Sequence, residues 1–253
     1  MAKIIAAVNQ KGGVGKTTTV VNLSAALALL DKKVLIVDLD PQGNATSGIG
    51  IAKSGLAFSA YDLLIGTVPP EQAVLHTAFP RLDIVPTSMR MAGAEIELVD
   101  VPRRESRLKA ALAALRDAYD YIVIDCPPSL GLLTLNALCA ADTLLVPIQC
   151  EFFALEGLSQ LMSTVRQVKR LYNPALELEG VLMTMYDGRM NLTQQVVGEV
   201  KKFFPRKVFA TPIPRTVRLA EAPGYGQPIQ YYDKGSKGAA AYEQVARELL
   251  SHR

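Results

Sequence analysis

A glycine-rich segment near the start of the chain has the composition of a phosphate-binding loop. Residues 9–18 read NQKGGVGKTT, and glycines let backbone N–H groups approach an anion closely. In such a loop Lys16 would reach the β and γ phosphates of a nucleotide, and the Thr17 hydroxyl would bind Mg²⁺. A glycine turn with an incidental lysine is the structural alternative, and the strand, helix and acids around the loop weigh against it. The residues expected to line the phosphates are Lys11, Gly12, Gly13, Val14, Gly15, Lys16, Thr17 and Thr18.

Two apolar runs end in carboxylates, which phosphoryl transfer to water needs for holding a metal and placing a water molecule. Asp125 follows the run YIVI and has the form of a Walker B acid, so we expect it to hold the Mg²⁺ shell through water. Asp38 follows the run VLIV and would support the metal and the loop that continues through Asp40. An acid at a strand end is also a common turn or helix-cap residue, and that interpretation stays open, above all for Asp38.

The elements that must position these residues alternate between strands and helices. Short, β-branched apolar runs predict buried parallel strands over residues 4–8, 34–37, 82–85, 121–124, 143–146 and 178–183. Longer periodic segments predict helices over residues 17–30, 105–118, 155–171, 192–203 and 239–250. This alternation implies right-handed crossovers between parallel strands. We therefore predict an α/β P-loop NTPase fold, with a mostly parallel twisted sheet covered by helices on both faces and ligands beyond the C-terminal strand ends.

Length and composition fit one domain over residues 1–253. Of the 253 residues, 49% are hydrophobic, which suffices for a fully buried sheet. The first ten residues, MAKIIAAVNQ, hold an apolar run too short for a signal sequence or a membrane span, so we expect a cytoplasmic protein. The three cysteines, Cys126, Cys139 and Cys150, lie far apart in the sequence, which argues against a disulfide framework and against a zinc site.

Positive charge is concentrated in the C-terminal part of the chain. Residues 160–253 hold 14 Lys and Arg against 8 Asp and Glu, whereas residues 1–159 hold 13 against 16. Such an asymmetry hints at a polyanionic partner on one face. Solvated lysines on ordinary helices are the plainer explanation.

The phosphate loop departs from the common pattern G-x-x-x-x-G-K-[ST] in one position. Gln10 stands where the first glycine is expected, and a second lysine, Lys11, stands at the loop entrance. In this the chain resembles the deviant Walker A ATPases, which include ParA, the cell-division protein MinD, the nitrogenase iron protein and the arsenite-efflux ATPases. Further segments, spread over almost the full length, resemble the ParA/Soj partitioning ATPases. They are residues 40–46 (DPQGNAT), 126–131 (CPPSLG), 149–158 (QCEFFALEGL) and 213–223 (IPRTVRLAEAP).

The resemblance implies roles for individual residues. In this superfamily the entrance lysine reaches across a sandwich dimer, so Lys11 would contact the partner's phosphates and couple ATP binding to dimerisation; a merely solvated lysine is the alternative. Asp40 would orient the attacking water. Pro214 and Thr216 would border the adenine, although Thr216 replaces the usual Asn. Glu151 would help to place Lys11 or the dimer partner, and a helix N-cap is nearly as good an account.

The same resemblance implies nonspecific binding of double-stranded DNA by an ATP-bound homodimer. Arg189 and Arg218 match the positions of basic residues that contact DNA phosphates, and such contacts give affinity without sequence information. Four further cations are possible extensions of this surface: Lys201, Lys202, Arg206 and Lys207. Because the first predicted strand begins so early, we expect no preceding helix-turn-helix and no operator recognition. A ParB-type centromere-binding partner would stimulate hydrolysis and release the DNA, which implies a nucleoid-associated protein.

Other functions make different demands on the sequence. A MinD-like membrane switch needs a C-terminal amphipathic helix with bulky apolar anchors and basic flanks, whereas residues 239–253 are rich in Ala and Glu and are expected to pack on the body, without membrane binding. An iron–sulfur protein needs two cluster cysteines per subunit, and only Cys126 is placed to attract attention. A small-molecule kinase would need an arginine-rich lid, which we do not find. A non-hydrolysing structural role is opposed by the presence of Lys16 and Asp40.

Overall fold

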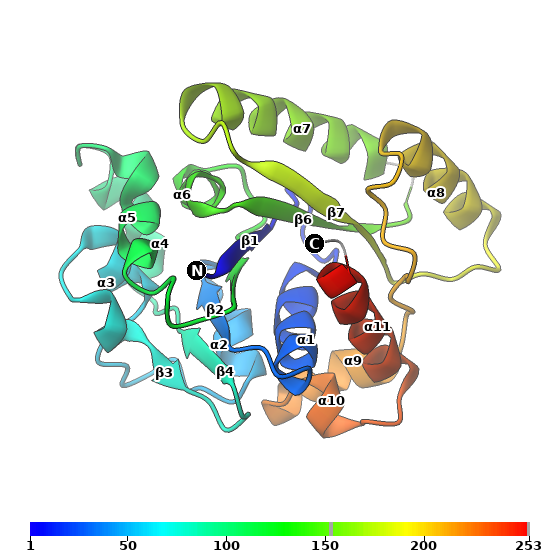
Figure 1. The fold of residues 1–253 in the computed structure, drawn as a ribbon, viewed down its shortest axis with the longest axis horizontal. Helices are drawn as coiled ribbons and strands as arrows, with labels where there is room; N and C mark the ends of the chain where they lie inside the picture. Colours follow the sequence, from blue (N-terminus) through cyan, green and yellow to red (C-terminus); the bar gives the residue numbers. More distant parts are fainter. Residues whose placement is uncertain (152–153, 252–253) are drawn as a thin grey trace.

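The computed structural model describes residues 1–151 and 154–251, and these form a seven-stranded sheet between two layers of helices (Figure 1). The strand order is β3-β4-β2-β5-β1-β6-β7, and every neighbouring pair is parallel except β3 with β4. The predicted fold class is therefore confirmed. The strands are β1 (Lys3–Ala7), β2 (Val34–Asp38), β3 (Leu75–His76), β4 (Leu82–Val85), β5 (Tyr121–Asp125), β6 (Thr143–Gln149) and β7 (Glu177–Thr184).

Helices cover both faces of this sheet. Figure 1 shows α1 and α11 side by side on one face, with α7 beyond β7 on the other. The α-helices are α1 (Lys16–Leu29), α2 (Asn44–Gly48), α3 (Ala60–Ile65), α4 (Met91–Glu97), α5 (Arg107–Ala113), α6 (Leu132–Ala140), α7 (Ala154–Leu171), α8 (Asn191–Phe203), α9 (Val217–Glu221), α10 (Ile229–Tyr232) and α11 (Lys237–Ser251). Short 3-10 helices occur at Pro70–Ala73, Arg104–Ser106 and Ala222–Tyr225.

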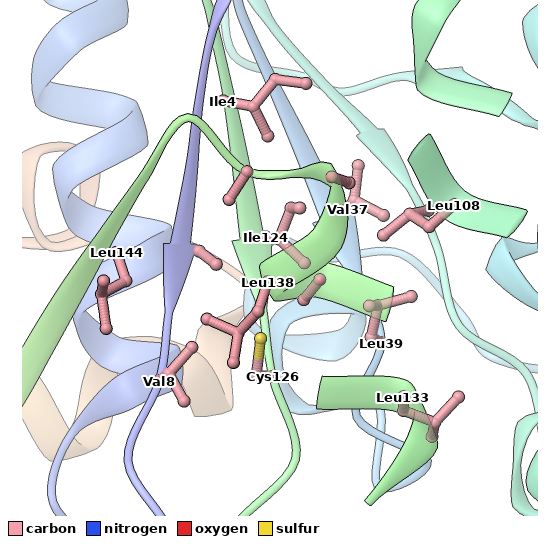
Figure 2. Packing of buried hydrophobic residues seen from close by; sticks show 14 of the residues in the cluster. Ile4, Val8, Val37, Leu39, Leu108, Ile124, Cys126, Leu133, Leu138 and Leu144 are labelled. Atoms are coloured by element: carbon pink, nitrogen blue, oxygen red, sulfur yellow. The ribbon is translucent and has the colours of Figure 1, made fainter. Parts of the chain in front are cut away.

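Alternate residues of each central strand supply two separate cores, as expected for a sheet buried on both faces. In β1, Ile4 and Ala6 belong to the core under α3 to α8, whereas Ile5 and Ala7 belong to the core under α1 and α11. Figure 2 shows Val37 and Ile124 of the sheet packed with Leu108 and Leu138 of the helices. Because both faces are covered, the strands need no polar alternation, which is why they appear in the sequence as continuous apolar runs.

The C-terminal ends of three neighbouring strands lie level with each other. In the register of the sheet Ala7 of β1 and Asp38 of β2 are both paired with Asp125 of β5. The glycine loop leaves β1 at this end and enters α1. Two carboxylates and the phosphate loop are thereby brought together at the C-terminal ends of the strands, as predicted.

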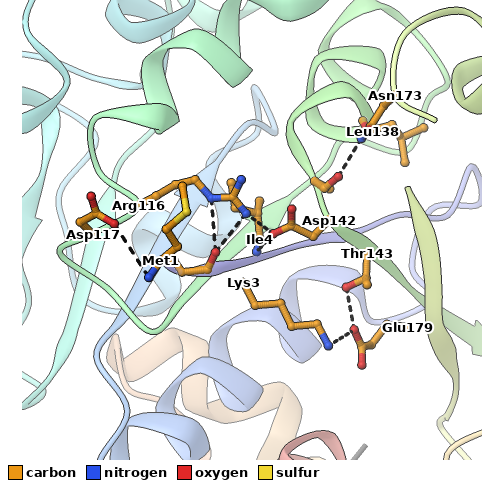
Figure 3. Close-up of polar contacts among 12 residues, drawn as sticks. Met1, Lys3, Ile4, Arg116, Asp117, Leu138, Asp142, Thr143, Asn173 and Glu179 are labelled. Atoms are coloured by element: carbon orange, nitrogen blue, oxygen red, sulfur yellow. Dashed lines mark hydrogen bonds and ion pairs between the residues drawn. The ribbon is translucent and has the colours of Figure 1, made fainter. Parts of the chain in front are cut away.

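The N-terminal ends of the strands are joined by polar contacts (Figure 3). Glu179 of β7 accepts hydrogen bonds from Lys3 Nζ at 2.6 Å and from Thr143 Oγ1 at 2.6 Å. Lys3 and Glu179 also border a cavity of about 320 Å³ together with Arg206 and Lys207. These two cations, which the sequence offered as extensions of a DNA-binding surface, therefore lie by the strand starts, away from the phosphate loop.

Several expected boundaries differ from the structure. The helix predicted over 105–118 is split, because Arg104–Ser106 is a 3-10 helix and α5 ends at Ala113, followed by turns such as that from Leu115 N to Leu112 O, 3.1 Å. The two-residue strand β3 and six of the helices were not predicted: α2, α3, α4, α6, α9 and α10. In the described ranges no helix has the length and apolar character that crossing a membrane requires.

Candidate nucleotide-binding site

The glycine loop has the backbone conformation that an anion-binding turn needs. Gly13 and Gly15 have φ values of +72° and +83°, in the left-handed region that side chains avoid. Thr184 at the end of β7 fixes the loop from behind, since its hydroxyl donates to Val14 O at 2.8 Å. Gly12 is exposed and Thr17 and Thr18 lie in the first turn of α1, so the N–H groups at the start of a 14-residue helix face the loop.

Lys16 lies in the centre of the candidate site. Its side chain is almost buried, and its ammonium group donates to Lys11 O across the loop at 3.0 Å. Burial lowers the pKa of Lys16, whereas the charges of Asp125 and Asp40 raise it. The Lys16 ammonium group is closed to bulk water in this position. An anionic ligand in the loop would accept hydrogen bonds from it.

Asp125 combines complete burial with a lack of hydrogen bonds of normal geometry among the described residues. It is fully buried, and neither oxygen has a hydrogen-bond partner of normal geometry among the described residues. Burial and the charge of Asp38 raise the pKa of Asp125 well above its usual value, and the Thr17 hydroxyl and the Lys16 ammonium act in the opposite direction. A buried carboxylate with vacant lone pairs beside a threonine hydroxyl is a donor set that suits Mg²⁺, which is often held by one or two carboxylates and by substrate phosphates.

Asp38 and Asp40 have different surroundings. Asp38 is fully buried, and its Oδ2 accepts from Thr46 N at 2.8 Å and from Thr46 Oγ1 at 2.7 Å. Burial raises the pKa of Asp38 to about 6, although the Thr46 hydrogen bonds lower it. Asp40 Oδ1 accepts from Gln42 N at 2.9 Å and closes the turn that leads to α2. The structure thus shows that Asp38 anchors Thr46, which is the kind of turn or cap role that the sequence left open. A role of Asp38 at the metal stays a prediction.

Lys11 does not extend freely into solvent. Its ammonium group forms an ion pair with Glu151, and its N–H donates to Asn9 Oδ1 at 3.0 Å. Glu151 follows β6 and comes directly before residues 152–153, which lie outside the described part of the QCEFFALEGL segment. Glu151 thus contacts Lys11 directly within one subunit, as expected if it helps to place this lysine.

A cavity of about 270 Å³ lies beside the loop, on the side of α9 and α11. Pro214 and Thr216 line it, and their expected place beside the adenine stays a prediction. The Thr216 hydroxyl is used elsewhere, because it accepts from Leu219 N at 3.3 Å and caps α9. The remaining lining residues are Gly15, Thr18, Thr184, Met185, Ile213, Arg215, Leu219, Ala220 and Tyr242.

The two arginines expected to bind DNA are exposed but paired with acids. Arg189 forms two parallel contacts with Asp187, Nε to Oδ1 at 2.9 Å and Nη2 to Oδ2 at 2.7 Å. This pair lowers the pKa of Asp187 to about 2. Arg218 lies 3.1 Å from Glu221 and 3.4 Å from Asp233. Either arginine would exchange an intramolecular carboxylate for a phosphate on binding DNA.

Two residues of the site were missed from the sequence. Thr184 supports the loop from a strand 170 positions away, and Thr46 holds Asp38. A threonine at the end of a predicted strand was a possible sign for Thr184. Thr46 lies in a short run, NATSG, without periodicity, so no local pattern indicated its contact.

Comparison with known proteins places this geometry in a family. The profile of a family described as an AAA domain matches residues 2–178. The chain is 56% identical over 252 residues to the sporulation initiation inhibitor protein Soj of Bacillus subtilis, covering 100% of both chains. It is 51% identical over 250 residues to the chromosome partitioning protein ParA of Myxococcus xanthus, covering 99% of this chain and 88% of that protein.

A solved structure shares this fold. The cobyrinic acid a,c-diamide synthase from Mycobacterium smegmatis with bound ADP and magnesium superposes with a TM-score of 0.88 at 41% identity, covering 100% of this chain and 95% of that one. The chain belongs to the ParA/Soj family of partitioning ATPases.

Proposed function

We propose that this protein hydrolyses ATP to ADP and phosphate in order to switch a DNA-binding dimer on and off during the segregation of a chromosome or plasmid. The proposal rests on the fully buried carboxylate of Asp125 beside Lys16 and the glycine loop, whose oxygens have no hydrogen-bond partner of normal geometry among the described residues. Relatives described as partitioning proteins support the biological role. We also propose that residues 1–253 form one domain.

The loop residues would bind the triphosphate. Backbone N–H groups between Gly12 and Thr18 would surround the β phosphate, and Lys16 would exchange its contact with Lys11 O for phosphate oxygens. Asp125 and the Thr17 hydroxyl would hold Mg²⁺, with Asp38 behind them. Bound Mg²⁺ supplies neutralisation of the charge on the phosphate oxygens. The relative solved with bound ADP and magnesium supports the binding of a nucleotide and Mg²⁺ here.

Asp40 would orient the attacking water at the open end of the loop. It is nearly buried, and only one of its oxygens has a hydrogen bond in the described residues, to Gln42 N. The second oxygen is therefore free to accept from water. Lys11 would leave Glu151 and contact the partner subunit's nucleotide, which makes dimerisation depend on ATP.

The cavity beside α9 would take the adenine. Its volume and its mixture of apolar and backbone groups suit a planar base. Pro214 would pack on the ring, and the backbone rather than the side chain of Thr216 would form the polar contact, because the Thr216 hydroxyl already caps α9.

Arg189 and Arg218 would contact DNA phosphates without sequence preference, and a ParB-type partner would stimulate hydrolysis and release the DNA. We propose a cytoplasmic, nucleoid-associated location. The MinD-like alternative is disfavoured by the position of α11, whose apolar residues Tyr242, Val245 and Leu249 are buried against the body rather than available to a lipid surface.

The decisive experiment is a DNA-binding titration with ATP, with ADP and without nucleotide, at several salt concentrations. We expect retention of double-stranded DNA only with ATP, with an affinity that falls as salt rises because the contacts are to phosphates. Equal binding in all three nucleotide states would overturn the switch. Binding of ATP-loaded protein to anionic vesicles instead of DNA would support the membrane alternative.

A further inference from the structure

Two glycines from distant parts of the chain touch backbone to backbone beside the candidate site. Gly50 follows α2, and Gly226 follows the 3-10 helix Ala222–Tyr225, with φ values of +83° and +64°. A Cβ atom on Gly226 would lie 2.6 Å from Gly50 Cα, and one on Gly50 would lie 3.1 Å from Gly226 O. Neither position accepts a side chain without a shift of the other segment.

Gly226 is rigidly joined to the wall of the base cavity. The 3-10 helix begins directly where α9 ends, and the Gly226 N–H closes it by donating to Pro223 O at 3.1 Å. Leu219 and Ala220 of α9 line the cavity. A displacement of α9 by the ligand would therefore be carried to Gly226 along two consecutive helical segments.

Gly50 is joined just as closely to the catalytic turn. Its N–H donates to Ser47 O at 3.0 Å, and Ile51 N donates to Thr46 O at 3.1 Å. Thr46 is bound to Asp38 by two hydrogen bonds. The turn before α2 is closed by Gly43 N to Asp40 O at 2.9 Å. A shift of α2 thus changes the position of Asp40.

We infer that the Gly50–Gly226 contact positions Asp40 according to the base in the cavity, so that the identity of the nucleotide controls kcat. The inference rests on the proposed function, since it assumes that Asp40 orients the attacking water. Two backbones in van der Waals contact have no side chain whose rotamer could absorb a small shift, so a displacement on one side is passed to the other. Gly50 and Gly226 are positioning residues, because neither is placed to touch the nucleotide.

The test compares steady-state hydrolysis of ATP and GTP by the full chain. The wild type should favour ATP in kcat. In Gly226→Ala the added methyl group separates α2 from α9, so we expect the ratio of kcat for ATP to kcat for GTP to fall about fivefold or more. KM for ATP should change little, since the substitution removes no residue of the loop or of the cavity lining. A purely structural defect would lower both kcat values together and leave their ratio unchanged.

Two alanine variants serve as matched controls. Gly55→Ala introduces the same residue at a left-handed φ of +76° with no atom within 4 Å, and Gly224→Ala adds a methyl group to the same 3-10 helix in open space. Both should keep the wild-type ratio. Gly50→Ala, with its milder 3.1 Å contact, should reduce the ratio and decides the matter if circular dichroism shows that Gly226→Ala is unfolded.

The outcomes separate this inference from the proposed function. A wild type that hydrolyses no nucleotide would contradict the proposed function. A wild type that hydrolyses ATP and GTP with equal kcat, variants at Gly50 and Gly226 that keep the ratio, or an equal loss in Gly55→Ala would each overturn the inference alone.

Discussion

Buried charge is concentrated around one point of this molecule. Three charged residues, Lys16, Asp38 and Asp125, are almost or fully buried at the C-terminal ends of the strands. Burying an ionised group costs several kcal/mol unless it is paired. Asp38 accepts hydrogen bonds from Thr46, whereas neither oxygen of Asp125 has a hydrogen-bond partner of normal geometry among the described residues. The free energy that nucleotide binding would release there offsets a cost already present in the folded chain, which is how a site is kept ready for its ligand.

Asp40 can be tested with a substitution that preserves its turn. In Asp40→Asn the Oδ1 atom still accepts from Gln42 N, so the loop should keep its conformation while the negative charge is lost. We expect ATP-dependent DNA binding to persist and phosphate release to slow about 100-fold or more. Phosphate release and DNA retention measured on the same sample check this. Asp31→Asn, at an exposed turn away from the loop, should behave as wild type, and normal turnover in Asp40→Asn would remove the residue from the mechanism.

The pairing of Arg189 with Asp187 gives opposite expectations for the two partners. Arg189→Glu should weaken DNA binding without affecting dimerisation, because a phosphate contact is replaced by repulsion. Asp187→Asn should strengthen binding, because the guanidinium no longer has to leave a carboxylate. Fluorescence anisotropy of a DNA duplex at two salt concentrations measures both. Unchanged affinity in both variants would place the DNA surface elsewhere.

The elements were predictable where their pattern is repetitive. The six parallel strands were found from the sequence within three residues at each end, because buried parallel strands are continuous apolar runs between helices. Leu132–Ala140 escaped because it is apolar throughout and offers no 3.6-residue contrast, and Leu75–His76 is too short to show a period. The phosphate loop was predictable from its glycines, whereas the contacts of Thr46 and Thr184 depend on segments that only the fold brings together.

The helix α2 shows how a tertiary contact creates an element. Its sequence, NATSG, contains no strong helix former besides Ala45. The helix exists because Gly43 takes a left-handed φ of +64° before it and because Asp38 accepts the Thr46 N–H within it. The Thr46 hydroxyl also accepts from Thr87 N at 3.0 Å, which links α2 to the segment after β4.

Thr46→Val therefore tests the anchoring of α2. The substitution keeps the shape of the side chain but removes a donor from Asp38 and the acceptor of the buried Thr87 N–H. We expect the free energy of unfolding to fall by about 1–3 kcal/mol, the usual cost of leaving a buried polar group unpaired. Urea denaturation measures this directly. Thr46→Ser retains the hydroxyl and should lose less stability, and a Val variant as stable as wild type would show that the anchor is unimportant.

At the scale of the whole molecule, the two ends of the strands have separate tasks. The C-terminal ends of the strands carry the loop, the acids and the cavity beside α9, whereas the N-terminal ends are fixed by contacts such as Lys3 with Glu179. Two of the basic residues of the C-terminal third, Arg206 and Lys207, lie near the strand starts and away from the phosphate loop.

The two lysines of the loop should separate nucleotide binding from assembly. Lys16 lies inside its own loop, whereas Lys11 reaches outward to Glu151. With Mg²⁺ and a nonhydrolysable ATP analogue at 100 times Kd, the wild type should gain about 2.7 kcal/mol of stability, seen as a rise in Tm. Lys16→Ala should show neither this rise nor a dimer in light scattering. Lys11→Ala should keep most of the rise and remain monomeric, because only its contact with the partner's phosphates is lost. A dimeric Lys11→Ala protein would mean that the ATP switch does not act through this residue.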